Sequence, residues 1–342
     1  MLPIKYLFYY TMLLKFRKKP DGNSFVCLFY DILSISLSAQ RIFMKRKAAI
    51  FLLLLNAIIS AAGYIWINTA LDAGLSATAI VTLRGYIACI GCFVLFGKQA
   101  SQTTRTEFFK CLILGAVNFL GFILSAESSA LSTPSNVSLI LSSCMVVVPF
   151  INWLVNRERP SIKVCLCALL CLFGIAVLTG SLKNGFSPDL GVLLAFASTL
   201  AFSFHTVLSS NYSKNVNYRA LVFYSALCMA IGGTVLYTFE PGAFCFSGID
   251  LIPAALSTLG LGLLASLAYF IIQMYTFAYV PVTTGILLLS TDAMFTSILS
   301  VIVGYDVLTA ELIAGGILIT VSVLLQELDL SVILKKEKKD PS

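Results

Sequence analysis

Three side chains that carry or can gain a charge lie inside long uncharged runs of this sequence: Arg84, His205 and Asp292. Burying a charged group at the centre of a bilayer costs roughly 2.5 to 3.5 kcal/mol, so each of them should face a polar cavity or a partner. The chemistry open to such groups is ligand binding, proton transfer or the joining of helices by hydrogen bonds.

Asp292 lies nine residues into its uncharged run, which is about 13 Å along a helix. An aspartate at this depth suits reversible protonation in a proton-coupled cycle, or binding of a substrate amine. The alternative is a structural aspartate, protonated or paired with an arginine. We expect a functional role, because the position related to it by the internal repeat described below holds Cys144, so the fold itself does not require an acid.

Arg84 lies about 12 Å into its run and could capture an anionic group such as a carboxylate, or position a gate. The alternative is a scaffold arginine that donates hydrogen bonds to carbonyls at helix ends. His205 is the only histidine of the chain. Because histidine titrates near neutral pH it suits a proton relay, and the alternative is a packed, hydrogen-bonded histidine.

Amide and aromatic side chains inside the runs form a second set that could hydrogen-bond to a polar solute or stack on it. Its members are Asn56, Asn68, Asn118, Gln273, Tyr64, Trp66, Tyr269 and Tyr275. Any one of them could equally join two helices or anchor a helix at the membrane interface. Together they suggest a moderately polar, aromatic-lined cavity.

Motifs for enzymatic chemistry are absent from the sequence. We find no nucleotide-binding loop, metal-ligand cluster or nucleophile triad, so we expect no catalytic residue, no metal site and no cofactor. Of the ten cysteines, eight lie in apolar runs and only Cys245 falls in a predicted external loop. The cysteines therefore predict no disulfide framework.

The composition identifies the solvent in which these residues lie. Of the 342 residues, 58% are hydrophobic and 11% are charged, whereas a soluble domain is roughly 45 to 50% apolar and about 25% charged. The formal net charge of +7 does not indicate nucleic-acid binding, because chains that bind polyanions are rich in charge. A soluble single-domain enzyme is excluded, and the lipid bilayer is the remaining solvent.

Ten apolar runs are long enough to cross a bilayer as helices. They are residues 48–70, 76–97, 108–126, 135–155, 161–179, 189–210, 219–239, 251–272, 283–304 and 310–326. The strict alternation of a β-barrel is missing. We therefore predict an all-α polytopic membrane protein with ten transmembrane helices.

The distribution of basic residues predicts the orientation. If the first helix runs outward, the segments on its starting side hold 15 lysines and arginines from Lys45 onward, against Lys183 alone on the other side. The positive-inside rule then places both termini in the cytoplasm, with the chain in the cytoplasmic membrane.

The two ends of the chain lie outside the ten runs. Met44 and the basic residues 45–47 directly precede the first run, as at an ordinary start of a membrane protein. We expect Met44 to be the initiator and residues 1–43 to be an over-extended reading frame. The alternative is a basic segment lying on anionic lipid. Residues 327–342 are expected to form a cytoplasmic basic tail.

An internal repeat organises the ten runs. At an offset of 148 residues, residues 139–143 (LILSS) align with residues 287–291 (LLLST). Each half, residues 48–179 and 189–326, then holds five predicted helices, and because five is odd the second half enters from the opposite side. This predicts two inverted five-helix repeats, an arrangement found in many secondary transporters.

Both halves resemble EamA-type units of the drug/metabolite transporter superfamily. The resemblance rests on residues 76–86 (SATAIVTLRGY), residues 135–149 ending in a proline, Trp153, residues 157–160 (RERP) and residues 174–178 (GIAVL). It implies that the first, third, fourth, sixth, eighth and ninth helices surround a central pathway.

The second repeat departs from the first at three positions. Ser297 stands at the place of Pro149, Asp306 at that of Glu158, and Asp292 at that of Cys144. We expect Pro149, Glu158 and Asp306 to be structural, with the two acids capping or hydrogen-bonding the next helix rather than touching substrate.

The expected function is secondary active transport of a small metabolite, amino-acid-like solute or drug, with export favoured and proton coupling through Asp292, assisted by His205. The alternative is a membrane-embedded enzyme or lipid-handling protein, which would need a cluster of His, Asp or Glu near one interface. The expected partners are a small-molecule substrate and the lipid bilayer, and no nucleic acid. The Gly315-Gly316 pair would allow close helix packing, including packing in a homodimer.

Overall fold

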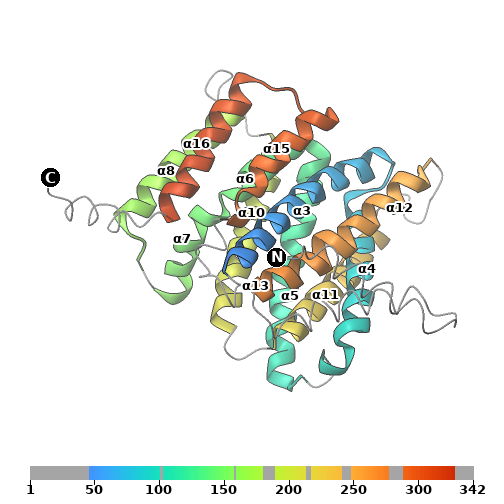
Figure 1. Ribbon diagram of the computed structural model, residues 1–342. Helices are drawn as coiled ribbons and strands as arrows, with labels where there is room; N and C mark the ends of the chain where they lie inside the picture. Colours follow the sequence, from blue (N-terminus) through green and yellow to red (C-terminus); the bar gives the residue numbers. More distant parts are fainter. Residues whose placement is uncertain are drawn as a thin grey trace, which may run out of the picture. The chain divides into compact units, whose positions relative to one another are not determined.

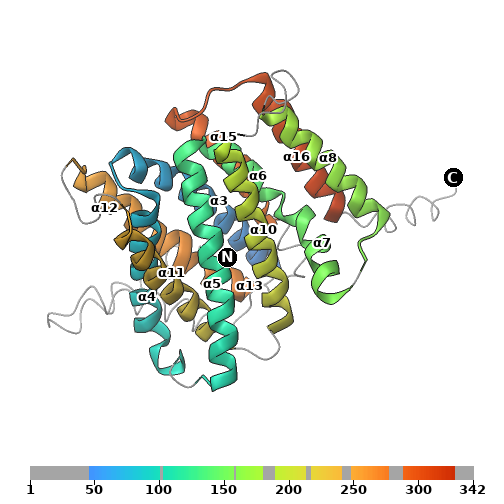
Figure 2. The same ribbon diagram turned by 180° about the vertical axis from the view of Figure 1, so that it is seen from behind.

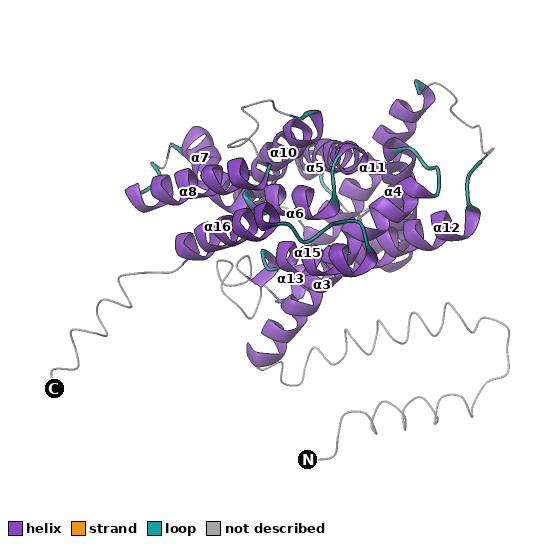
Figure 3. Ribbon diagram, turned by 90° about the horizontal axis from the view of Figure 1, so that it is seen from above, coloured by secondary structure: helices purple, strands orange, loops and turns teal. Residues whose placement is uncertain are grey.

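The described part of this computed structural model comprises residues 46–100, 103–157, 159–179, 189–212, 217–240, 248–276 and 288–327. It contains helices and loops and no strand (Figure 3). The predicted extension 1–43, Glu158 and the basic tail beyond Glu327 lie outside these residues.

The helices occupy the predicted apolar runs. Their bounds are α3 (Arg46–Asp72), α4 (Ala77–Ala100), α5 (Arg105–Leu131), α6 (Pro134–Ser142), α7 (Cys144–Asn156), α8 (Ile162–Leu178), α10 (Leu190–Tyr212), α11 (Tyr218–Thr238), α12 (Leu251–Leu259), the π-helix η2 (Gly260–Ala268), α13 (Tyr269–Thr276), α15 (Asp292–Val303) and α16 (Ala310–Glu327). Seven helical stretches are long and apolar enough to cross a membrane, and α8, α15 and α16 are shorter apolar helices. The chain is a multi-pass helical membrane protein.

Two of the predicted continuous runs are interrupted. The fourth run divides into α6 and α7 because the Ser143 hydroxyl and amide both donate to the Ile140 carbonyl, at 2.5 and 3.1 Å. The ninth run has the same break, where the Thr291 hydroxyl and amide donate to the Leu288 carbonyl at 2.6 and 3.3 Å. A hydroxyl that binds a carbonyl of the preceding turn competes with the helix ladder. Pro149, expected to be structural, lies inside α7.

The contacts between helices occur in corresponding pairs. The α3 helix packs against α12, η2, α13 and α15, and its counterpart α10 packs against α5, α6 and α7. The contact of α4 with η2 corresponds to the contact of α11 with α5, and both contacts join the two halves. Two further pairs join equivalent helices, α4 with α11 and α8 with α16, and the α8–α16 pair is clear in Figures 1 and 2.

Glycines permit close packing in the α4–α11 and α8–α16 pairs. A Cβ at Gly85 would lie 2.5 Å from the Ala230 amide nitrogen, and a Cβ at Gly233 would lie 3.0 Å from the Thr82 Cα. A Cβ at Gly315 would lie 2.7 Å from the Leu178 Cα in α8. The packing face of Gly315 is therefore used within the chain. Small residues let helix backbones approach in this way inside membranes.

Candidate functional site

A cavity of about 480 Å³ lies among the helices of both halves. It is lined by Ser60, Gly63, Tyr64, Ile67, Arg84, Asn118, Phe122, Ser125, Leu141, Ser142, Cys144, Met145, Phe202, His205, Thr206, Ser209, Leu221, Val222, Ser225, Ala265, Tyr269, Phe270, Gln273, Leu289, Ser290 and Asp292. A concave, mostly apolar space with a few polar groups is the usual form of a small-molecule site.

Asp292 is the acidic residue of this lining. It is the first residue of α15, so its position follows from the break at Thr291. Its Oδ2 atom accepts a hydrogen bond of 2.8 Å from the Ser60 hydroxyl of α3. Within the described residues it forms no ion pair with a lysine, arginine or histidine. The positive end of the helix dipole favours a carboxylate at a helix start.

Arg84 also lines the cavity, but its guanidinium already has protein partners. Its Nε atom donates to the Ser266 hydroxyl at 2.6 Å and its Nη2 atom donates to the Ala265 carbonyl at 2.8 Å. The Phe122 ring lies against it, 4.1 Å from the guanidinium carbon to the ring centroid. These contacts join α4 to the π-helix η2 and match the scaffold role considered for Arg84.

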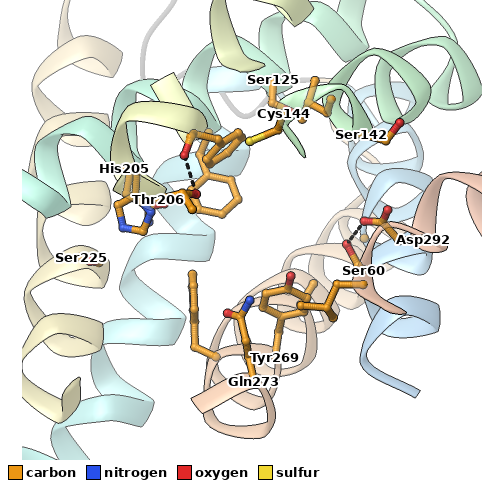
Figure 4. A pocket seen from close by; sticks show the side chains of 18 of the residues that line it. Ser60, Ser125, Ser142, Cys144, His205, Thr206, Ser225, Tyr269, Gln273 and Asp292 are labelled. Atoms are coloured by element: carbon orange, nitrogen blue, oxygen red, sulfur yellow. Dashed lines mark hydrogen bonds between the residues drawn. The ribbon is translucent and has the colours of Figure 1, made fainter. Parts of the chain in front are cut away.

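His205 lies in α10, on the opposite side of the cavity from Asp292. Figure 4 shows His205 and Thr206 facing Ser60 and Asp292 across the space. Within the part of the chain that the structure describes, His205 has no hydrogen-bond partner. His205 lines the cavity, and its role in a proton relay stays a prediction.

Four of the predicted amides and aromatic residues line the cavity: Tyr64, Asn118, Tyr269 and Gln273. Tyr64 and Tyr269 line the same cavity as Asp292 and Arg84. The Asn118 amide is buried, and its Nδ2 atom has no partner among the described residues. It can hydrogen-bond to a bound solute.

Three predicted residues of this set do not line the cavity: Asn56, Trp66 and Asn68, whose Nδ2 atom donates to the Tyr64 carbonyl at 3.1 Å. Asn56 is fully buried and its Nδ2 atom donates to the Tyr269 carbonyl at 3.2 Å. The Trp66 ring packs against Gly260, where a Cβ would lie 3.0 Å from the indole. Asn56 and Trp66 therefore act in helix packing.

Asp306 caps a helix of the other half rather than the next helix in the chain. Its Oδ2 atom accepts hydrogen bonds from the Ser135 amide of α6 at 3.2 Å and from the Ser300 hydroxyl at 2.5 Å. It lies at one end of the helices and does not line the cavity.

Sequence reasoning missed the hydroxyls of the cavity: Ser60, Ser125, Ser142, Thr206, Ser209, Ser225 and Ser290. Ser142 and Ser290 stand at equivalent places in the repeated pattern, so the repeat itself was a signal for them. The cavity-lining positions of α3 and α10 also correspond, at an offset of 142 residues. The α3 positions hold Ser60, Gly63, Tyr64 and Ile67, and the equivalent α10 positions hold Phe202, His205, Thr206 and Ser209. The two halves thus offer equivalent positions with different side chains.

Two segments, residues 47–180 and 189–326, match the model of the EamA-like transporter family. The chain belongs to the EamA-like transporter family. This family is part of the drug/metabolite transporter superfamily, and the two matches confirm the predicted resemblance of both halves.

Two other proteins are similar over most of this chain. A protein of Archaeoglobus fulgidus described as an uncharacterized transporter is 26% identical over 285 residues, covering 83% of this chain and 87% of the relative. A crystal structure of another protein aligns with a TM-score of 0.53 and 18% identity, covering 86% of this chain and 99% of the other. It shows the shared fold.

Proposed function

We propose that this EamA-like protein is a secondary active transporter that exports a small solute across the cytoplasmic membrane in exchange for protons. The observation that carries the proposal is Asp292, a carboxylate at the start of α15 that faces a cavity among apolar helices. An intramembrane acid facing a cavity is typical of coupling sites in transporters. We assign no catalytic step to the chain.

The proposed architecture is ten transmembrane helices in two inverted five-helix units, with both termini in the cytoplasm. The paired helix contacts support it, as do the matched breaks at Ser143 and Thr291. In such transporters, interrupted helices near the midplane form the substrate and ion sites. The cavity-lining residues Cys144 and Asp292 follow these two breaks.

Alternating access is supported by matched contacts at the two ends of the helices. At one end, the Thr69 hydroxyl of α3 lies 3.2 Å from the Tyr305 hydroxyl that follows α15. At the other end, Asn211 of α10 exchanges amide hydrogen bonds of 3.0 and 3.2 Å with Asn156 of α7. Breaking one contact while keeping the other would open the cavity to one side at a time.

The cavity reaches the start of α11, and this supports an opening of the cavity toward the cytoplasm. Leu221, Val222 and Ser225 line it from the first turns of α11. At this helix start lies Arg219, one of the basic residues that the positive-inside rule assigns to the cytoplasm. At the opposite end, the Asp250 amide donates to the Ala73 carbonyl at 3.0 Å and the Ser76 hydroxyl to Glu240 at 2.8 Å, contacts that join the two halves.

The test is a metabolite screen with the full chain in proteoliposomes under an imposed pH gradient. We expect gradient-driven flux of at least one solute, and we expect Asp292→Asn to reduce it by about 100-fold, the effect of losing one buried charged contact. Asp250→Asn is the matched control, because the Asp250 side chain makes no capping hydrogen bond at the start of α12. Normal coupled flux in Asp292→Asn would refute the coupling, and no flux of any solute would refute transport.

A further inference from the structure

Two walls of the cavity are built from equivalent helices. In the first wall α3 packs against α13, and in the second α10 packs against α5. The helices α3 and α10 correspond at an offset of 142 residues, and α5 and α13 correspond at the offset of 148, which pairs Phe122 with Phe270. The two walls are therefore two versions of one helix contact, and their side chains can be compared position by position.

A backbone carbonyl is held in the same way in both walls. The Asn56 side-chain amide of α3 donates to the Tyr269 carbonyl at 3.2 Å. The Ser198 hydroxyl of α10 donates to the Gly121 carbonyl at 2.8 Å. Donors and acceptors are equivalent at the two offsets. These bonds set the register of each contact, so the side chains one turn later on α3 and α10 take equivalent places.

The sizes of the side chains at these places are exchanged between the walls. The first wall pairs the small Ser60 with the large Tyr269. The second wall pairs the large Phe202 with Gly121, which has no side chain. A Cβ at Gly121 would lie 2.7 to 3.0 Å from three atoms of the Phe202 ring, so this ring lies directly on the α5 backbone. Each wall thus holds one ring that lines the cavity, supplied by α13 in the first and by α10 in the second.

The Phe202 ring is held in place by α5. Besides its contact with Gly121, it packs edge to face on the Phe122 ring, with centroids 5.1 Å apart. The Phe122 ring lies in turn on Arg84, 4.1 Å from the guanidinium carbon to the ring centroid. Interiors packed in this way yield little to a change in volume. A solute therefore meets the Phe202 ring as a fixed surface.

We propose that Phe202 is a specificity-determining residue, whose ring limits the size of the apolar part of the transported solute. This inference rests on the proposed transport through the cavity of about 480 Å³ and names the residue that sets its size limit. An apolar pocket separates ligands that differ by one methylene group by roughly 10- to 200-fold. Truncating one core side chain can open an apolar cavity that binds benzene. Replacing Phe202 by the serine that stands at its counterpart should therefore admit solutes larger by about one ring.

The chain offers a matched control in Phe119. Its ring lies on Gly232 as the Phe202 ring lies on Gly121, since a Cβ at Gly232 would lie 2.7 to 3.0 Å from the same three ring atoms. Phe119 is not among the described residues that line the cavity. Phe202→Ser and Phe119→Ser thus remove the same kind of packing, but only Phe202→Ser changes the wall.

Cys144 reports the space beside Phe202. It lines the cavity, and its sulfur accepts a hydrogen bond of 3.2 Å from Ser203, the next residue of α10. The purified full chain is treated with N-methylmaleimide or with the larger N-(1-pyrenyl)maleimide, and modification of Cys144 is followed by peptide mass spectrometry. We expect wild type and Phe119→Ser to react much faster with the small reagent. Phe202→Ser should raise the relative rate of the large reagent by at least about tenfold.

Two results of this labelling would overturn the inference. One is the same relative rate in Phe202→Ser as in Phe119→Ser. The other is a wild-type chain that admits both reagents equally, and this result needs no variant to fold. Failure of N-methylmaleimide to modify Cys144 in the wild-type chain would contradict an accessible cavity, and with it both this inference and the proposed function.

The metabolite screen in proteoliposomes separates the inference from the proposed function. Phe202→Ser should carry solutes larger than any that the wild type carries. Adding Gly121→Tyr returns a ring to the wall from α5, as Tyr269 supplies one from α13, and should remove those solutes again. If Phe202→Ser carries the wild-type set at wild-type rates, the size limit is overturned and transport stands. If no solute moves while the labelling changes as expected, transport is overturned and Phe202 remains the wall that limits the cavity.

Discussion

The starts of α7 and α15 have the same backbone and different chemistry. Ser143 and Thr291 have φ of −63° and −69°, both with ψ of −9°, and each hydroxyl binds a carbonyl three residues back. The next residue is Cys144 in one half and Asp292 in the other, and both line the cavity. Each also accepts from a serine hydroxyl, Ser203 at 3.2 Å for the Cys144 sulfur and Ser60 at 2.8 Å for the aspartate.

This comparison separates what the fold needs from what the function needs. The fold needs the break, because a hydroxyl makes it in both halves. It does not need the acid, because α7 starts without one. Asp292 is therefore a difference between two otherwise equivalent positions of the repeat. Exchanging the side chains at positions 144 and 292 tests its role.

The largest effect is expected from moving the carboxylate to the other half. Asp292→Cys alone should reduce transport by about 100-fold, the effect of one lost charged contact. Adding Cys144→Asp should restore flux to within about tenfold of wild type, since Ser203 replaces Ser60 as the hydroxyl donor. The measurement is initial uptake in proteoliposomes. If the double variant is no more active than Asp292→Cys, the two breaks are not interchangeable.

A smaller effect distinguishes the two sides of the α4–α11 contact. Gly85→Ala should lower stability by about 2 to 3 kcal/mol and Gly233→Ala by about 1 kcal/mol, within the range for overpacked cores. The reason is that the new Cβ at position 85 meets the backbone of Met229 and Ala230, whereas at position 233 its nearest atom is the Thr82 hydroxyl, which can move to a second rotamer by giving up its hydrogen bond to the Thr78 carbonyl. The measurement is the thermal unfolding midpoint of each variant in detergent, which should be lower for Gly85→Ala than for Gly233→Ala.

Gly316→Ala is the control for this pair, because its Cβ would lie 3.5 Å from the Leu139 side chain, an ordinary contact. Equal losses at positions 85 and 233 would show that the two sides of the contact are equally rigid.

The smallest effects are expected at the ends of the helices. Asp306→Ala removes acceptors for the Ser135 amide and the Ser300 hydroxyl and should cost about 1 to 2 kcal/mol, as the loss of a helix cap does. Asn211→Ala removes an exposed amide contact with Asn156 and should cost less than about 0.5 kcal/mol. The stabilities of the two variants are compared by their unfolding midpoints in detergent. A greater loss of stability for Asn211→Ala than for Asp306→Ala would contradict this prediction.

Most of the helix positions could be predicted from uncharged length alone, because a backbone in lipid must satisfy its own hydrogen bonds. The predicted run 108–126 was too short, since α5 begins at Arg105 with a Thr104–Glu107 capping box that lies outside the uncharged window. The break at Ser143 could not be predicted either. A serine in a membrane helix commonly bonds to a carbonyl of the preceding turn without ending the helix, as Ser129 does in α5.

The candidate site was only partly predictable, because sequence does not say which way a helix faces. In a membrane, the side toward lipid and the side toward other helices are both apolar, so the amphipathic signal of soluble helices is weak. Asn56 and Ser60 lie one turn apart on α3, yet Asn56 joins α13 while Ser60 lines the cavity. The charged residues were easier to identify because burying them in lipid is costly.

The difference between Cys144 and Asp292 has a consequence for the evolution of such proteins. A protein assembled from two identical five-helix chains can place only an even number of carboxylates at its two equivalent breaks. Once the two copies are joined in one chain and diverge, an odd number becomes possible, and here one acid stands opposite a cysteine. Gene fusion thus gives access to a site with a single negative charge, which two copies of one gene product cannot build.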